Sequence, residues 1–342
     1  MGADKKSALP ARRESDKQAM SFGEIYGHDR QKAFLRAAAG GGRLAHAYLF
    51  HGCEGIGKKT MAGVFAAALL CDRGADEACG SCLACRKVKS GNHPDLIRMA
   101  AEGAFIKMQA VRELMAAMAF RPMEGGRRIF IIEDADRMHH TAANALLKTL
   151  EEPAAANLLI LVTAKPFLLP RTILSRCQQL RFSPLPRETV ARFLRESAAV
   201  DENAARAIAA GAEGSIARAR QLLGEDFLEA RQEIMGRIAD PGVGAPLERL
   251  ALLRCLGRSK KDIPDRLSLL QSCFRDAMIW KETGDVAALA HADRRDDIRR
   301  LARLTTEELL FNLETVAASL RALEANANKS LTLEAMTFTL HL

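Results

Sequence analysis

A glycine-rich segment between an apolar run and a helical run is the first feature able to do chemistry. It reads Gly52-Cys53-Glu54-Gly55-Ile56-Gly57-Lys58-Lys59-Thr60 and lies between AHAYLF and MAGVFAAALL. Glycines let successive backbone N–H groups turn towards phosphate oxygens, and a lysine at this spacing reaches the outer phosphates. Gly52, Gly57 and Lys58 therefore predict a phosphate-binding loop that opens a helix.

The same loop departs from the pattern that hydrolysis requires. The residue after the lysine should carry a hydroxyl group that binds Mg²⁺. Here that residue is Lys59, and Thr60 comes one position late. The acidic half of the site should be an Asp followed by a Glu after an apolar strand, but RIFII runs into Glu133-Asp134, in inverted order.

A degenerate nucleotide site follows from these departures. ATP binding stays open, whereas hydrolysis is not expected, because a displaced carboxylate costs about 100-fold in rate per ångström. A plain polar strand end is the alternative for the two acids. The predicted site residues are Gly52, Gly55, Gly57, Lys58, Lys59, Thr60, Glu133 and Asp134.

Four cysteines form a second chemical motif, spaced Cys71-x7-Cys79-x2-Cys82-x2-Cys85. Thiolates packed this closely can surround one tetrahedral Zn²⁺ ion, and four protein ligands close its coordination sphere. The motif therefore predicts a structural zinc site, with an iron-sulfur cluster as the alternative. The scattered cysteines are expected to be small buried apolar residues: Cys53, Cys177, Cys255 and Cys273.

Composition places these motifs in an ordinary globular protein. The chain has 342 residues, 48% of them hydrophobic and 27% charged, which predicts more than one domain and excludes collagen-like and wholly disordered chains. No apolar run is long enough to cross a bilayer, and the start of the chain lacks a signal peptide, so a cytoplasmic protein with no membrane partner is expected. A net charge of +8 suits either nucleic-acid phosphates or a solvated basic surface.

Short apolar runs that alternate with helical stretches predict a parallel sheet that positions the motifs. The expected strands are 45–50, 95–99, 128–132, 157–163 and 178–182. Between them, Val111, Leu114, Met115 and Met118 have helical spacing and should form a buried face. The strand signals stop at Ser183-Pro184-Leu185-Pro186, which reads as a domain boundary.

The chain after this boundary is expected to be all-helical. A small glycine-interrupted portion ends near Leu223 and precedes a larger one. An apolar stripe at helical spacing in the larger portion predicts a core face. Its members are Leu309, Leu313, Val316, Leu320 and Leu323.

Together the motifs resemble those of bacterial clamp-loader subunits of the AAA+ class. The resemblance is carried by HAYLFHG before the loop, the four-cysteine insertion after it, and then NHPDLI, RIFIIEDADRM, NALLKTLEEP and TILSRC, in this order across most of residues 20–230. It implies an α/β P-loop AAA+ domain with a five-stranded parallel sheet, a small helical lid domain and an all-α C-terminal collar domain. The expected boundaries are 1–20 for a flexible tail, 21–182 for the AAA+ domain with its zinc insertion at 71–85, 183–224 for the lid and 225–342 for the collar.

Two types of subunit in this family share the insertion: the gamma/tau ATPase and the delta prime subunit, which generally does not hydrolyse ATP. Gamma-type chains have a hydroxyl residue where this chain has Lys59, and Asp-Glu where it has Glu133-Asp134. They also place an arginine in a Gly-Ser-x-Arg turn, where this chain has Ala217 and then Arg218. These departures make the chain similar to the delta prime type, which is not catalytic alone.

The resemblance also implies partners and one further functional residue. The partners are the gamma/tau and delta subunits of the DNA polymerase III holoenzyme, with the sliding clamp and primed DNA in the assembled complex that serves DNA replication. In Ser175-Arg176-Cys177 the arginine would act in trans, as an arginine finger in a neighbour's ATP site. Without the resemblance, Arg176 would be an ordinary surface arginine. An active gamma/tau-type ATPase and a zinc-dependent nucleic-acid-binding protein with a relict phosphate loop are the alternatives.

Overall fold

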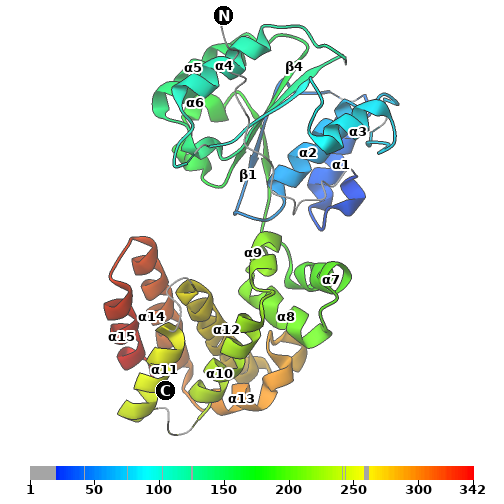
Figure 1. Cartoon of the computed structure of the whole chain (residues 1–342). Helices are drawn as coiled ribbons and strands as arrows, with labels where there is room; N and C mark the ends of the chain where they lie inside the picture. Colours follow the sequence, from blue (N-terminus) through cyan, green and yellow to red (C-terminus); the bar gives the residue numbers. More distant parts are fainter. Residues whose placement is uncertain are drawn as a thin grey trace, which may run out of the picture. The chain divides into compact units, whose positions relative to one another are not determined.

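The computed structural model separates the chain into two compact units. One holds the residues up to Cys53 and Gly57–Phe182, and the other holds Glu54–Ile56 and Ser183–Leu342 (Figure 1). The structure describes residues 21–41, 43–74, 76–101, 103–124, 126–240, 242, 244–257 and 262–342. The predicted tail at 1–20 lies outside the described residues. The boundary between the two units lies at Ser183, where the proline-rich stretch begins. The further division of the second unit into a lid and a collar stays a prediction.

A parallel sheet forms the centre of the first unit, in the order β2-β3-β4-β1-β5. β3 and β4 have the bounds predicted from the sequence, β2 and β5 are one residue shorter at one end, and β1 begins two residues and ends one residue later than predicted. The strands are β1 Ala47–His51, β2 Leu96–Met99, β3 Arg128–Ile132, β4 Asn157–Thr163 and β5 Gln178–Arg181. All neighbouring pairs are parallel, so the carboxyl ends of all five strands lie at one edge. The predicted α/β class with five parallel strands is confirmed.

Helices cover both faces of this sheet (Figure 1). They are α1 Asp29–Ala39, α2 Lys58–Leu69, α3 Leu83–Ser90, α4 Met108–Met118, α5 His140–Glu151 and α6 Arg171–Leu174, with short 3₁₀ turns η1 Phe22–Glu24, η2 Ala135–Arg137 and η3 Pro166–Leu168. Val111, Leu114 and Met118 are buried as predicted, and Met115 packs partly buried at the edge of the same core. This core joins α4 and α5 to β1, β3 and β4.

The described part of the second unit is entirely helical, as predicted. Its helices are α7 Arg187–Ala198, α8 Glu202–Gly211, α9 Ile216–Gln221, α10 Glu225–Ile238, α11 Pro246–Gly257, α12 Ile263–Thr283, α13 Arg295–Leu301, α14 Thr306–Glu324 and α15 Lys329–Thr339, with 3₁₀ turns η4 Val286–Ala288 and η5 Ala292–Arg294. α14 begins with a capping box, because Thr305 accepts from the Glu308 amide while the Glu308 side chain accepts from Thr305.

The apolar stripe of α14 is only partly in the core. Leu309 and Val316 are buried, whereas the other three members are half-buried. The face turned fully inward also contains the polar residues Asn312 and Ser319. The Asn312 side chain donates to the backbone oxygen of His341 at 2.7 Å and accepts from its N–H at 2.8 Å, which satisfies this buried amide. The end of the chain is thereby fixed to α14.

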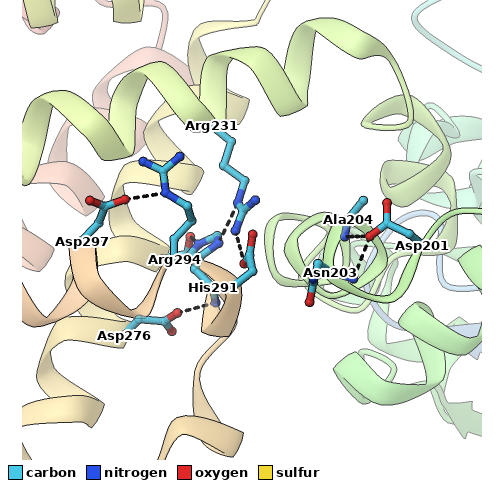
Figure 2. A network of polar contacts seen from close by, with 10 residues as sticks. Asp201, Asn203, Ala204, Arg231, Asp276, His291, Arg294 and Asp297 are labelled. Atoms are coloured by element: carbon cyan, nitrogen blue, oxygen red, sulfur yellow. Dashed lines mark hydrogen bonds and ion pairs between the residues drawn. The ribbon is translucent and has the colours of Figure 1, made fainter.

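A polar network is buried between α10, α12 and the segment before α13 (Figure 2). Arg231 Nε donates to His291 Nδ1 at 3.1 Å, so the imidazole is neutral with its proton on Nε2. That Nε2–H donates to Ser272 Oγ at 2.7 Å, and the Ser272 hydroxyl donates to a backbone oxygen of α12. The His291 N–H donates to Asp276, and Arg231 pairs with Asp293. Burial lowers the pKa of His291 well below its ordinary value.

Candidate functional site: a degenerate nucleotide loop, a cysteine cluster and an exposed arginine

The predicted phosphate loop runs from the carboxyl end of β1 to the first turn of α2. Gly57 is its last residue and has φ of 102°, a left-handed conformation that glycine adopts without strain. Lys58 follows as the first helical residue, and it is 6% exposed. Its ammonium group donates to the backbone oxygens of Gly52 at 2.6 Å and Cys53 at 2.5 Å. The loop lysine therefore lies folded into its own loop.

Lys59 forms ion pairs with both acids that follow β3. Its Nζ lies 2.9 Å from Asp134 Oδ2 and 3.3 Å from Glu133 Oε2. Partial burial alone would lower the pKa of Lys59, but the hydrogen bond to Asp134 and the two negative charges outweigh it and raise that pKa. The side chain is therefore charged at neutral pH. The Lys59 ammonium group therefore lies between the loop and the acidic pair Glu133 and Asp134.

The backbone around the acids explains how they reach Lys59. The Glu133 N–H donates to the oxygen of Met99 and so continues the ladder between β3 and β2. Asp134 has φ of 52° and turns the chain sharply at the strand end. Both carboxylates consequently lie at the carboxyl edge of the sheet, where β1 also ends. Thr60, by contrast, is exposed on the next position of α2.

Thr163 is a polar residue at this edge that no motif in the sequence singles out. It is the last residue of β4 and pairs in register with His51, the last residue of β1. Its buried hydroxyl bonds to Asp136, and it accepts from the Lys165 N–H at 3.0 Å. The available signal was a hydroxyl residue directly after the apolar run 158–162, because strand ends at this edge of a parallel sheet supply binding groups.

The tip of the loop, Glu54–Ile56, belongs to the second compact unit. The Ala217 N–H donates to the Gly55 oxygen at 3.1 Å. A Cβ atom at Gly55 would lie 2.2 Å from Ser215 Oγ and 2.7 Å from Ala217 Cβ, so only glycine fits. The short side chain of Ala217 therefore permits close backbone contact with Gly55.

Arg218, one position further on, is directed at α12. Its guanidinium donates to Ser268 Oγ at 2.9 Å and to Asp265 Oδ1 at 3.2 Å, and it lies 3.3 Å from Glu213. These contacts tie the first turn of α9 to α12 within the second unit. Arg218 thus stabilises the packing of α9 against α12.

The four predicted metal ligands come together between α2 and α3. The sulfur atoms of Cys71, Cys79, Cys82 and Cys85 lie within 4.8 Å of one another. Sulfurs about 3.8 Å apart surround a tetrahedral ion at 2.3 Å from each, so this spacing fits one metal ion.

Backbone N–H groups point at the cluster as they do around bound thiolates. The N–H groups of Cys79, Cys82 and Cys85 donate to the sulfurs of Cys71, Cys79 and Cys82 at 3.3 to 3.4 Å. Backbone hydrogen bonds from Ser81 and Cys82 lower the pKa of Cys79 to about 5, whereas burial raises the pKa of Cys85. The donor set and its surroundings therefore suit a metal that binds thiolates.

The remaining cysteines divide differently from the prediction. Cys177, Cys255 and Cys273 are buried as expected, and burial raises the pKa of Cys177 to about 12. Cys53 is exposed, so the prediction of a buried residue is wrong there. The reason is local, because the loop turns its backbone oxygens inward to Lys58 and leaves this side chain outside.

Arg176 lies just after α6, with 35% of its side chain exposed. Its Nη2 is 2.7 Å from Glu151 Oε1, at the end of α5, and its Nη1 donates to the Thr172 oxygen at 3.0 Å. The arginine is thus held at the surface of the first unit by two points of attachment. Part of the guanidinium side chain therefore remains accessible to solvent.

A phosphate loop after β1, the strand order β2-β3-β4-β1-β5 and a following helical unit define a protein of the AAA+ class. Two family models match the chain. One is described as DNA polymerase III, delta subunit, over residues 27–186, and the other as DNA polymerase III, delta subunit, C terminal, over residues 225–341.

Curated relatives define the family further. The chain is 34% identical to the delta prime subunit of DNA polymerase III from Pseudomonas aeruginosa, over 90% of this chain and 94% of that protein. It is 38% identical to the Bacillus subtilis delta prime subunit, over 56% of this chain and 58% of that protein. The chain belongs to the delta prime subunit family of DNA polymerase III, which confirms the predicted resemblance.

More distant matches include the tau/gamma side of the family. The tau subunit of Escherichia coli is 34% identical over 59% of this chain and 32% of its own length. Among solved structures, a gamma subunit-related protein of Thermotoga maritima is 17% identical, covering 90% of this chain and 96% of its own, with a TM-score of 0.43. Among the described residues, none of the helices combines the length and apolar character needed to span a membrane.

Proposed function

We propose that this chain serves in a clamp-loader complex as a subunit that does not hydrolyse ATP. The observation that carries this proposal is the pairing of Lys59 with Glu133 and Asp134. An ammonium group held by both acids takes the place at which hydrolysing relatives need a hydroxyl ligand and a divalent cation. The contacts of Arg218 with α12 support the same proposal, because they direct this guanidinium to another helix.

The proposed partners are the gamma/tau and delta subunits, and the sliding clamp and primed DNA are the targets of the assembled complex. Family membership supports these assignments, since the relatives are named as subunits of DNA polymerase III. The subunit would act as a rigid stator in the complex. The ties between α9 and α12 are consistent with such rigidity.

The cysteine cluster is proposed to hold one structural Zn²⁺ ion through Cys71, Cys79, Cys82 and Cys85. Four thiolates leave no open position on the ion, so its role would be to fix the segment between α2 and α3. The P-loop is proposed to bind ATP weakly, without turnover.

Arg176 is proposed to project into the ATP site of a neighbouring subunit. A planar, permanently charged guanidinium suits the charge that develops on a γ-phosphate during transfer. The test is ATP hydrolysis by complex reconstituted from this chain with the gamma/tau and delta subunits of the same organism, wild type against Arg176→Ala.

The variant is expected to assemble normally, as judged by gel filtration, and to lower both hydrolysis and clamp loading. Loss of an arginine finger costs about 10³- to 10⁵-fold at the affected site, so total hydrolysis falls in part when other ATP sites remain. Arg176→Lys should restore little, because a point charge lacks the planar fork. Equal hydrolysis and equal clamp loading in wild type and Arg176→Ala would remove the trans-acting role.

A further inference from the structure

The carboxylate of Glu151 forms an ion pair with the guanidinium of Arg176. Glu151 is the last residue of α5, and its Oε1 lies 2.7 Å from Arg176 Nη2. We propose that Glu151 is a positioning residue for Arg176, which holds the guanidinium in the orientation that meets a neighbour's nucleotide. This inference rests on the trans-acting role proposed above.

Two attachments on different nitrogens determine the plane of the guanidinium. The Thr172 oxygen accepts from Nη1 at 3.0 Å, with Ser175 Oγ at 3.5 Å from the same nitrogen, while Glu151 binds Nη2. With the contacts of Nη1 alone, the fork of Arg176 could still turn about its outer bonds. A second anchor on Nη2 removes this freedom and so preorganises the group.

The turn that carries Arg176 is itself well fixed. The Arg176 N–H donates to the oxygen of Ile173, and Gln179 Nε2 donates to the oxygen of Leu174 at 3.0 Å. Ile173 is fully buried in the core shared with α5. Because the backbone is held in this way, the remaining freedom is in the long arginine side chain, which Glu151 restrains.

The pair leaves donors for a phosphate. A guanidinium has five N–H donors, and the contacts to Thr172, Ser175 and Glu151 use only some of them. Glu151 is 51% exposed, so solvent screens the pair and a single carboxylate competes weakly with a phosphate that carries more negative charge. Glu151 can therefore orient Arg176 without withholding it from the neighbour's nucleotide.

The next residue offers a matched control. Glu152 has the same charge, follows directly in the chain and is exposed at the end of α5. The ion pair that the structure shows for Arg176 comes from Glu151. Replacement of either glutamate removes one negative charge near the end of α5, but the ion pair with the arginine involves Glu151.

The experiment measures ATP hydrolysis by the reconstituted complex with Glu151→Ala, Glu151→Gln, Glu152→Ala, Arg176→Ala and the double variant Glu151→Ala/Arg176→Ala. The Arg176-dependent rate is the wild-type rate minus the Arg176→Ala rate. Glu151→Ala is expected to lower the kcat of this part about threefold to tenfold, the usual size of coupling between contacting side chains, with KM for ATP unchanged. Glu151→Gln should lose less, because its amide oxygen still accepts a hydrogen bond.

The controls separate this inference from the function on which it rests. Glu152→Ala should equal wild type, and Glu151→Ala should have no effect in the Arg176→Ala background. If Arg176→Ala itself changes nothing, the trans-acting role fails and the inference fails with it. If Arg176→Ala lowers the rate but Glu151→Ala does not, or if Glu151→Ala acts equally without Arg176, the positioning role alone is overturned.

Discussion

Lys59 Nζ lies 2.9 Å from Asp134 Oδ2, although 75 positions separate the two residues in the chain. In P-loop NTPases that hydrolyse nucleotide, a Ser or Thr hydroxyl at the position of Lys59 binds Mg²⁺. Here the ammonium supplies positive charge to the acidic pair but offers no lone pair to a cation. The predicted nucleotide loop therefore retains its glycines and its first lysine, while both predicted acidic residues pair with an ammonium group from the same unit.

Hydrolysis by the isolated chain should be indistinguishable from that of the Lys58→Ala variant. Lys59→Thr alone should leave turnover near this background, because the inverted order of Glu133 and Asp134 and the Ala217 backbone contact remain. Steady-state phosphate release with Mg²⁺ is the measurement. Wild-type turnover at a rate typical of clamp-loader motors would favour the gamma/tau alternative.

Purified protein should contain about one zinc per chain by elemental analysis. Replacing Cys79 and Cys82 together by Ser should abolish it, because both thiols belong to the cluster. Cys177→Ser with Cys255→Ser is the matched control and should retain the metal, since both cysteines lie outside the cluster. Iron in place of zinc, or protein free of metal after reducing purification, would contradict the proposed site.

The second unit should lose stability as the pH falls below about 6.5. His291 has a pKa well below its ordinary value, because burial and then the nearby guanidinium of Arg231 disfavour its charged form. His291 therefore takes up a proton near pH 6.5 in the unfolded chain but stays neutral in the native state. The contribution of neutral His291 to the free energy of unfolding is complete above pH 6.5 and decreases below it. The loss is at most about 1.4 kcal/mol between pH 6.5 and 5.5.

Trp280, the chain's one tryptophan, lies on α12 and reports on this unit by fluorescence. Urea unfolding at pH 7.5 and 5.5 should show the loss in wild type and a smaller pH effect in His291→Gln. Burial raises the pKa of Asp276 above its ordinary value near 3.8. As the pH rises above 3.8, this shift lowers the stability of the unit, so its effect is opposite to that of His291. The difference between the two proteins isolates the histidine, and identical pH dependence would refute its role.

Arg249 should stabilise the end of the chain. From α11 its guanidinium donates to the backbone oxygens of Thr337, Phe338 and Leu340, at 2.8 to 3.2 Å. Arg249→Met keeps the stem but leaves these oxygens without a charged donor, so unfolding free energy should fall by about 1 to 2 kcal/mol. Arg254→Met, an exposed arginine on the same helix, should be neutral in the same urea experiment.

Local patterns in the sequence determined much of the fold. The apolar runs RIFII and NLLILVT form the parallel strands β3 and β4, which are buried except for Asn157 at the start of β4, because their composition suits burial on both faces. The glycine loop and the cysteine cluster could also be predicted, because the residues of each motif lie in one short segment of the sequence. The backbone conformation of the loop and the distances between the thiols could be obtained only from the structure.

Tertiary structure decided the pairings between distant residues. The parallel strand order brings Lys59 to Glu133 and Asp134, and no period in the sequence gives the direction of those side chains. The same holds for the ion pair between Arg176, in the turn after α6, and Glu151, the last residue of α5. Spacing predicted the buried stripe of α14 only approximately, because packing against the chain end turned Asn312 inward and satisfied its amide. Periodicity fixes which residues share a face, whereas long-range contacts fix what that face meets.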